Sequence, residues 1–390
     1  MPYYQRLGDV PRKRHTRAES VDGLLHEELM GLEGFANASS LLYHRHSPSA
    51  IVAAEPVARR NDEASYDAVL EPRHLRTFDL PVGGDPVLGR IDLFENEDVT
   101  IGVAAATASS GLYRDALGDQ LVFVQGGAAI LESSFGSLPV GAGDYVVIPR
   151  STTHRWVVET QDGGEPVRLL GIEARTAHVQ PPAKYLNAQG QFLEGAPYCE
   201  RDLRGPAELV SDDEGDVEVL VRHRGGLTRL TYAHHPFDVV GWDGCVYPYA
   251  FNIGDFQPIV GQLHQPPPVH QTFQGGGFVV CSFVPRPYDF HPDAIKVPYH
   301  HANVDSDEIL YYVEGNFMSR AGSGIGVGSI SYHPAGFVHG PQPGSVERSM
   351  SEDRTNEVAV MIDTFRPLKL SETARSISAD DYPWSWAGGR

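Results

Sequence analysis

Two neighbouring stretches decide the fold, "SDEILYYVEG" at 306–315 and "GSISYHPAGFVHGP" at 328–341. The first is an apolar run that ends in glycine, which is typical of a β-strand. In the second, Gly328 is followed by five residues, then by Pro334 and, five residues further on, by His339. The glycine and the proline favour a tight turn between two strands. We therefore expect His339 early on the outgoing strand.

The first half of the chain carries a weak copy of the same pattern. There, "GDQLVFVQGG" at 118–127 leads to "GDYVVIPRSTTHRW" at 143–156, with the same glycine, proline and histidine spacing up to His154. Two copies of one β-module predict two similar barrels in one chain. We predict an all-β dominated protein of two β-barrel (jelly-roll) domains with a few short helices. Its domains are 1–210, with a leading arm, and 211–390, with a C-terminal tail.

Other segments complete this outline. The Pro-rich "VQPPAKY" at 179–185 and the acidic "SDDEGD" at 211–216 are typical of linkers and place the boundary near Val210. The segment "ESVDGLLHEELMGLEG" at 19–34 is a helix candidate. The apolar run "FVVCSFV" at 278–284 is far shorter than the roughly 18 residues of a membrane helix. It is therefore predicted to be a buried strand.

Charge and cysteine content exclude several functions. Lys and Arg number 31 against 51 Asp and Glu, a formal net charge of 31 − 51 = −20, and so acidic a surface repels phosphate backbones. The basic run "RKRHTR" at 12–17 is therefore interpreted as a solvated or subunit-contact arm rather than a nucleic-acid patch. The three cysteines form neither a disulfide framework nor a CxxC zinc pattern, and the N-terminus lacks a signal-peptide core. We expect a cytoplasmic protein.

Polar residues at metal-ligand spacing precede the first of the two deciding strands. In "VPYHHANVDSDEILYYVEG" at 297–315, His301 and Asn303 are followed after four residues by Glu308. With the turn that carries His339, this resembles the paired motifs of the cupin superfamily. The resemblance implies that the two histidines and the glutamate project into a small barrel, with Asn303 in the place of a further histidine. Two imidazoles and one carboxylate leave three cis positions open on a metal, as in non-heme Fe(II) oxygenases.

Two neighbours compete for these ligand places. His300 adjoins His301, but side chains alternate along a strand, so only one of the two can point inward. The motif spacing favours His301. Asp307 is the rival of Glu308, although aspartate is favoured in turns for its hydrogen bonds to the backbone.

The first copy lacks this ligand set. Gln120 takes the place of the carboxylate, no histidine precedes it, and Ser151 stands where a glycine is usual. A neutral amide and one imidazole make a poor divalent-ion site. We predict a metal-free structural copy in which His154 is a core or surface histidine.

The resemblance extends to one cupin family, the homogentisate 1,2-dioxygenases. It is carried by "HPFDVVGWDGCVYPY" at 235–249, "FVVCSFVPRP" at 278–287, "VPYHHANVDSDE" at 297–308 and "HPAGFVHGPQPG" at 333–344. "LLHEELMGLEGFANASSLLYHRHSPSAI" at 24–51 resembles the bacterial branch. The resemblance implies Fe(II), a small aromatic substrate and O2, and the opening of homogentisate to maleylacetoacetate in aromatic amino-acid catabolism. It also implies a homo-oligomer, a trimer or larger.

Further residues are implied around the metal. His264, in "GQLHQPPPVHQTF", stands where the family carries its acid–base histidine, with His270 as the alternative. Histidine suits this role because its unperturbed pKa of about 6.5 lets it exchange protons near neutrality. Tyr299 shares the strand face of the first ligand, so it is expected to hydrogen-bond a reaction intermediate. His333 is expected to orient a ligand or the substrate.

Two departures from the better-known eukaryotic branch leave the substrate open. Four residues separate Asn303 from Glu308 where that branch has three, and Phe317 stands where it has a tyrosine near the substrate. One alternative is a ring-cleaving dioxygenase for gentisate, a hydroxyanthranilate or a secondary-metabolite phenol. Another is a non-redox bicupin isomerase or binding protein, because fold does not fix function. The same ligands would also take Mn, Co, Ni or Zn.

Overall fold

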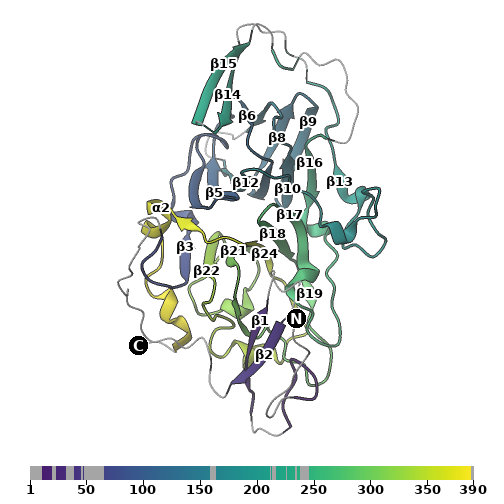
Figure 1. Cartoon of the computed structure of the whole chain (residues 1–390), viewed down its shortest axis with the longest axis vertical. Helices are drawn as coiled ribbons and strands as arrows, with labels where there is room; N and C mark the ends of the chain where they lie inside the picture. Colours follow the sequence, from purple (N-terminus) through teal and green to yellow (C-terminus); the bar gives the residue numbers. More distant parts are fainter. Residues whose placement is uncertain are drawn as a thin grey trace.

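The computed structural model describes residues 11–19, 23–31, 39–44, 47, 66–158, 164–210, 212, 217–224, 226–232, 235–237 and 246–387. These residues form mainly β-sheets, and Figure 1 shows β5, β8, β10 and β12 above β18, β21, β22 and β24. The helices among them are short: α1 (Ser345–Ser349), α2 (Glu372–Ser376), and the 3-10 turns η1 (Thr77–Asp79), η2 (Ala183–Tyr185), η3 (Glu200–Asp202), η4 (Ile253–Asp255), η5 (Pro267–His270), η6 (Met318–Arg320) and η7 (Tyr382–Ala387). No helix in this part of the chain is long and apolar enough to cross a membrane.

Two sheets make up the upper jelly roll. The eight-stranded sheet has the order β13-β16-β10-β7-β12-β5-β4-β25. Its strands are β4 (Ile91–Glu95), β5 (Val99–Ala106), β7 (Gln120–Gly126), β10 (Asp144–Ile148), β12 (Val167–Ala174), β13 (Leu203–Arg204), β16 (Tyr249–Asn252) and β25 (Lys369–Leu370). The six-stranded sheet has the order β15-β14-β6-β11-β8-β9. Its strands are β6 (Leu112–Asp115), β8 (Ala128–Ser133), β9 (Gly136–Gly141), β11 (His154–Val157), β14 (Val217–His223) and β15 (Gly226–Tyr232).

Apolar side chains from both of these sheets fill the space between them. Val122 of β7, Leu131 of β8 and Trp156 of β11 belong to one buried cluster. Strands β14, β16 and β25 come after Val210 and yet pair with strands of the first half, and β15 joins the same sheet through β14. The predicted boundary near Val210 stays a prediction.

Three sheets make up the lower jelly roll. The six-stranded sheet, in the order β17-β18-β24-β21-β22-β3, contains β3 (Arg73–Arg76), β17 (Gln271–Gly275), β18 (Phe278–Phe283), β21 (Asp307–Glu314), β22 (Ser329–His333) and β24 (Val358–Thr364). The three-stranded sheet, in the order β2-β1-β20, contains β1 (His26–Gly31), β2 (Ser39–His44) and β20 (His300–Asn303). The two-stranded sheet pairs β19 (Arg286–Pro287) with β23 (Arg354–Thr355).

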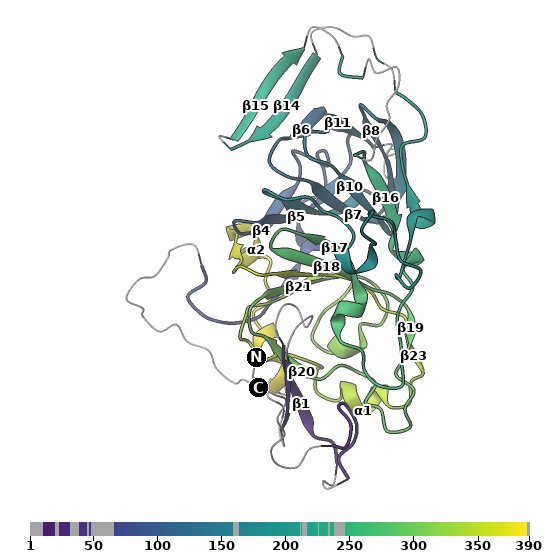
Figure 2. The same cartoon turned by 45° about the vertical axis from the view of Figure 1, so that its right-hand side comes forward.

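A third apolar layer joins the two jelly rolls. Ile309 and Tyr311 of β21 belong to a core shared with the eight-stranded sheet, whereas Leu310, between them, belongs to a separate cluster inside the lower jelly roll. Tyr145 of β10 reaches across the shared core to a hydrogen bond of 2.8 Å between its hydroxyl and that of Ser282. Figure 2 shows β7 and β10 above β17, β18 and β21. Because side chains alternate along a strand, Glu308 points to the interior with Leu310.

The structure confirms the predicted fold class and corrects one element. The predicted strands are β7, β10, β18 and β21, and Ser151 (φ 68°) and Gly336 (φ 81°) take the same left-handed conformation in the two copies. The predicted helix at 19–34 is wrong, because its described part contains strand β1. That strand pairs with β2 on one side and β20 on the other, and these hydrogen bonds outweigh the helical propensity of its Leu, Glu and Met residues.

Parts of four quoted segments lie outside the described residues. They are 20–22 and 32–34 of the helix candidate, 32–38, 45–46 and 48–51 of the segment at 24–51, 238–245 of the segment at 235–249, and most of the acidic stretch at 211–216.

Candidate metal centre

Three side chains from separate segments meet inside the lower jelly roll. His301 lies on β20, Glu308 near the start of β21, and His339 on the chain that follows β22. His301 and His339 form a backbone bridge in which each N–H donates to the other carbonyl, at 2.8 and 2.9 Å. One candidate ligand atom from each of the three residues lies within 4.8 Å of the others. The structure therefore brings the predicted His–Glu–His set together.

Backbone hydrogen bonds fix how the two imidazoles point. Nδ1 of His301 donates to the carbonyl of Tyr299 at 3.2 Å, and Nδ1 of His339 donates to that of Phe337 at 3.0 Å. A carbonyl only accepts, so Nδ1 carries the proton and Nε2 of a neutral ring keeps its lone pair. The Nε2 atoms lie 3.7 Å (His301) and 3.3 Å (His339) from the carboxylate of Glu308.

This arrangement fits a cation. Nε2 of His339 is buried and makes no hydrogen bond in the described structure. A lone pair that faces a carboxylate oxygen at 3.3 Å is unfavourable. A positive ion between the two atoms would turn this repulsion into coordination, with nitrogen and oxygen donors that suit Fe, Mn, Co, Ni or Zn.

Burial and hydrogen bonding set the ionisation of these groups. Burial lowers the pKa of His339 to about 4, and it also lowers the pKa of His333 well below its usual value. Burial alone would raise the pKa of Glu308, but its interaction with His339 and the hydrogen bond from His333 hold it well below its usual range. Neutral imidazoles beside an ionised carboxylate are the forms that bind a divalent metal.

His333 supports the carboxylate from the neighbouring strand. It lies directly opposite Glu308 in the β21–β22 pair, and its Nδ1 donates to the Glu308 carboxylate at 2.9 Å. Its Nε2 then accepts from the hydroxyl of Tyr382, in η7, at 3.0 Å. The ring also stacks on His339, with centroids 3.8 Å apart. Sequence reasoning missed Tyr382, which no local motif marks.

Asn303 and Asp363 lie on the other side of Glu308. Asp363 pairs with Glu308 across β21 and β24, and it accepts a hydrogen bond of 3.4 Å from the amide of Asn303. Burial, and then the charge of Glu308, raise the pKa of Asp363 well above its usual value. Asn303 thus contacts a second buried acid that lies beside Glu308. Asp363 was also missed, since only the strand register brings it here.

Asp307, the alternative carboxylate ligand, makes hydrogen bonds outside the His–Glu–His cluster. It accepts hydrogen bonds from the N–H of Ala335 (2.8 Å), the N–H of Leu368 (2.7 Å) and the hydroxyl of Tyr332 (3.1 Å). Alternation along β21 sends its side chain away from Glu308. The structure thus places Glu308, and not Asp307, with the two histidines.

A cavity of about 140 Å³ reaches His301 and Glu308. His264, His270 and Tyr299 also line it, so the predicted acid–base candidates and the predicted tyrosine meet at one cavity. The ring of His264 lies edge-on to that of Tyr299, with centroids 5.0 Å apart. His264 comes from the loop before η5, His270 from η5 itself, and Tyr299 from the approach to β20.

The two acid–base candidates differ in their surroundings. Nδ1 of His264 lies 3.7 Å from a carboxylate oxygen of Asp289, and the side chain is 18% exposed. Burial lowers the pKa of His264, and the nearby carboxylate of Asp289 offsets only part of this lowering. His270 packs against Phe283 at 4.8 Å, and burial lowers its pKa well below the usual value. His264 therefore has the better-placed imidazole for proton exchange.

Two other residues of the sequence analysis lie apart from the cluster. His300 packs beside His26, with ring centroids 5.9 Å apart, as alternation along β20 requires. Phe317 belongs to the apolar cluster of Leu310 and Met361 and is not among the residues that line the cavity. Its ring therefore lies in the core behind the cavity wall.

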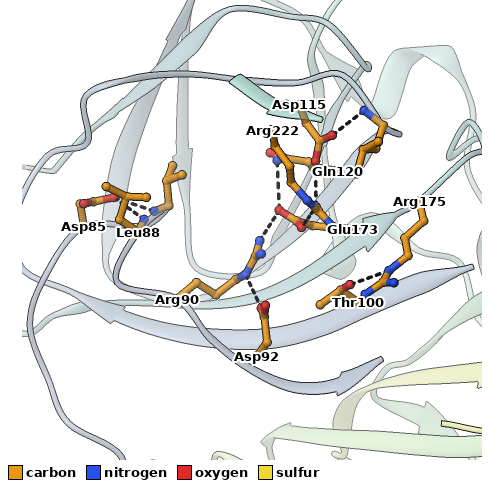
Figure 3. Close-up of polar contacts among 12 residues, drawn as sticks. Asp85, Leu88, Arg90, Asp92, Thr100, Asp115, Gln120, Glu173, Arg175 and Arg222 are labelled. Atoms are coloured by element: carbon orange, nitrogen blue, oxygen red, sulfur yellow. Dashed lines mark hydrogen bonds and ion pairs between the residues drawn. The ribbon is translucent and has the colours of Figure 1, made fainter. Parts of the chain in front are cut away.

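The corresponding place in the upper jelly roll holds an ion-pair network (Figure 3). Glu173 of β12 lies opposite Gln120 and accepts a hydrogen bond of 3.1 Å from its amide. The same carboxylate is paired with both Arg90 and Arg222, and Arg222 also binds Asp115 at 2.9 Å. Guanidinium groups are donors only and cannot bind a metal.

His154 is a core histidine of this upper jelly roll. It is buried, its Nδ1 donates to the carbonyl of Thr152 at 3.1 Å, and burial lowers its pKa to about 4. Its ring lies edge-on to Tyr113, with centroids 5.7 Å apart.

Jelly rolls with a His–Glu–His cluster inside one of them define a cupin-type protein. A family model, "Homogentisate 1,2-dioxygenase N-terminal", matches residues 87–253. A "Putative dioxygenase" of Saccharolobus solfataricus is 38% identical over 390 residues, with 99% of each chain covered. Homogentisate 1,2-dioxygenase of Emericella nidulans is 26% identical over 378 residues, covering 89% of this chain and 81% of the relative. A solved cupin 2 conserved barrel domain protein from Leptotrichia buccalis is 9% identical, with a TM-score of 0.34, over 75% of this chain and 96% of that chain.

The chain belongs to the homogentisate 1,2-dioxygenase family. Its relatives by sequence carry dioxygenase names across almost the whole of its length. Membership in a family of dioxygenases is therefore established, and the substrate is a separate question.

Proposed function

We propose that the protein is an Fe(II)-dependent ring-cleaving dioxygenase that converts homogentisate and O2 into maleylacetoacetate. The observation that supports this most is the cluster of His301, Glu308 and His339 beside a cavity that His264 also lines. The reaction balances without another reductant, because both atoms of O2 enter the opened ring. The substrate chemistry is taken from the relatives that bear the homogentisate name.

His301, Glu308 and His339 would hold the iron. When bound, Fe(II) would supply the Lewis-acid and redox chemistry for a phenolic substrate and O2. The role of this chain's own residues is to orient the ring, to exclude water and to move protons.

His264 takes a phenolic proton as the substrate binds and returns it later in the reaction. Asp289, 3.7 Å from Nδ1 of His264, helps to fix the orientation of the ring. Burial raises the pKa of Tyr299, which keeps its hydroxyl protonated and able to donate a hydrogen bond into the cavity. Leu310 and Met361, on the cavity wall, supply an apolar surface for an aromatic ring.

A different hydroxylated aromatic acid, such as gentisate or a hydroxyanthranilate, is the second candidate substrate. It is favoured by the position of Phe317, whose ring lies in the core and presents no hydroxyl to the cavity. A third candidate, a non-redox isomerase or binding protein, shares the fold but would consume no O2.

The test is anaerobic loading with Fe(II), addition of homogentisate, and measurement of O2 uptake and product mass. We expect one O2 consumed per substrate and a product that contains two more oxygen atoms. Glu308→Gln should abolish uptake, while His178→Ala, at an exposed histidine of the upper jelly roll, should not change it. If O2 is consumed with another phenolic acid but not with homogentisate, that acid replaces homogentisate as the proposed substrate. If the iron-loaded protein consumes no O2 with any phenol, the proposal of a dioxygenase is contradicted.

The cellular compartment and the oligomeric state are also proposals. We infer that the enzyme acts in the cytoplasm as a homo-oligomer, a trimer or larger, with a small aromatic acid and O2 as its partners. Light scattering after size exclusion should give at least three times the chain mass of 42.6 kDa. A mass equal to one chain would contradict this assembly.

A further inference from the structure

The N-terminal arm, residues 11–19 and 23–31, contacts the lower jelly roll close to the candidate metal centre. Arg12 and Arg17 of its basic run are exposed, as a solvated arm requires, but His15 and Thr16 between them are buried. Thr16 forms an isolated β-bridge with Ala294. The arm is therefore fastened to the body of the protein at the residue next to His15.

His15 forms a buried hydrogen bond within the N-terminal arm. Its Nδ1 donates to the carboxylate of Glu27 at 2.5 Å, and the two side chains are 2% and 3% exposed. Nε2 of His15 and the second carboxylate oxygen of Glu27 are buried without a hydrogen bond in the described structure. An unsatisfied buried polar group costs about 1–3 kcal/mol. An arm that only covered apolar surface would avoid this cost with an apolar side chain.

The backbone at His15 is also unusual. Its φ is 57°, in the left-handed region that residues other than glycine rarely adopt. Such conformations persist only where the surrounding structure imposes them, and they are concentrated at functional sites. The bridge at Thr16 and the hydrogen bond with Glu27 are the contacts that impose this one.

The ring of His15 packs behind two residues of the active-site cavity. Its centroid lies 5.0 Å from that of His264 and 5.1 Å from that of Tyr299, which it meets edge-on. His264 and Tyr299 contact each other as well, so the three rings form a closed triangle. Tyr299 separates the active-site cavity from a second cavity of about 570 Å³, which His15 and Glu27 line. His15 thus supports the cavity wall from its rear side.

The same arm also pairs with the strand of the first candidate ligand. β1 runs parallel to β20, with Leu29 in register with His301. Glu27 lies two residues before Leu29 on β1, so the pairing of β1 with β20 also fixes the position of Glu27 relative to the strand of His301. The N-terminal arm therefore contacts both the acid–base side and the ligand side of the site.

We propose that His15, oriented by Glu27, is a positioning residue that holds His264 and Tyr299 in the orientation in which they face the substrate cavity. The N-terminal arm then contributes to catalysis by orienting two residues of the active-site cavity. This inference rests on the proposed function for the role of His264. Its physical content, the restraint of two side chains by a third, does not depend on the identity of the substrate.

The test compares His15→Ala and Glu27→Gln with Arg17→Ala, an exposed position on the same arm, all in the full-length protein. Hydrogen–deuterium exchange of peptides over 259–265 and 297–301 reports the restraint directly. We expect faster exchange in these two segments for His15→Ala, a smaller effect for Glu27→Gln, and no change for Arg17→Ala. Added imidazole, which can occupy the space left by His15→Ala, should restore part of the protection.

Turnover gives the second readout. For His15→Ala we expect kcat/KM to fall by roughly 10- to 100-fold, the usual loss when the group that orients a functional residue is removed. Most of the loss should be in kcat, with iron content unchanged. Imidazole should restore part of the rate as it restores the protection.

Two outcomes would overturn the proposal. One is unchanged exchange in both segments, and the other is faster exchange spread over the whole chain, which indicates a loss of stability only. If the wild-type protein turns over no phenol, the proposed function fails, but the exchange pattern still decides the role of His15. If His15→Ala does not fold, Glu27→Gln, which keeps the shape and one acceptor oxygen, decides it.

Discussion

Replacement of the two adjacent carboxylates of β21, one at a time, should separate metal binding from folding stability. Glu308→Gln keeps the shape of the side chain and an oxygen that can accept from Nδ1 of His333. It removes the negative charge from the cluster of imidazoles. Asp307→Asn is the matched change on the opposite face of the same strand.

The expected loss of stability for Asp307→Asn follows from its three donors. One carboxylate oxygen accepts from Ala335, and the other accepts from both Leu368 and Tyr332. An amide has only one acceptor oxygen, so its NH2 group must face at least one of these donors. Each hydrogen bond to a charged group contributes about 1.5–3 kcal/mol. The variant loses at least one of the three bonds, and the other two weaken because their acceptor is no longer charged. We expect the free energy of unfolding to fall by roughly 3 kcal/mol or more.

Glu308→Gln should behave in the opposite way. The metal-stripped variant keeps its hydrogen bond with His333, so its free energy of unfolding should change by about 1 kcal/mol or less. Its affinity for Fe(II) should fall by more than the roughly 10- to 100-fold that the loss of an outer supporting group causes.

Urea unfolding of the metal-stripped proteins and Fe(II) titration of the folded proteins measure the two effects separately. If Asp307→Asn lost iron at full stability while Glu308→Gln still bound it, the assignment of the carboxylate would be reversed. Equal loss of stability in the two variants would contradict the assignment of opposite faces.

Four further substitutions test the rest of the site and the core of the upper jelly roll. His264→Gln should lower kcat by roughly 10²- to 10⁴-fold, the usual contribution of a general acid–base group, with iron content unchanged in metal analysis. His333→Leu should weaken Fe(II) binding about 10- to 100-fold in titration, and Tyr382→Phe, which removes only a bond to His333, should weaken it less. The pKa of buried His154 is about 4 in the folded protein and about 6.5 when unfolded, so its contribution to stability is full above pH 6.5 and is lost as the pH falls toward 4. The slope of the unfolding free energy against pH measures the protons taken up on unfolding. His154→Asn should therefore lower this uptake by up to one proton between pH 4 and pH 6.5.

The parts of the site that the sequence predicts are those fixed by local geometry. Strand alternation separates His300 from His301, and a turn of fixed length follows β22 before His339, so both features depend on residues close in sequence. The expected outgoing strand is wrong, because His339 forms only an isolated β-bridge with His301. The assignment of Glu308 over Asp307 needs more. It depends on backbone donors from Ala335 and Leu368, which only the folded chain brings to Asp307.

The parts that the sequence does not predict depend on pairing between distant segments. Asp363 reaches Glu308 through the register of β24 on β21, and Tyr382 reaches His333 from the C-terminal turn η7. The strand β1 forms because β2 and β20 lie on either side of it, although its composition favours a helix. His15 was read as part of a solvated basic run for the same reason, since nothing near it in the sequence indicates the contact with His264.

The two jelly rolls show how one fold can provide either a closed ion pair or a metal site. A buried carboxylate must be paired with positive charge. In the upper jelly roll, Glu173 is paired with two guanidinium groups, which keep their charge at any physiological pH. In the lower jelly roll, the neighbours of Glu308 include His333 and His339, and burial lowers the pKa of both. These imidazoles are neutral near pH 7, so the carboxylate still requires a cation, and the lone pair on Nε2 of His339 is available to bind one.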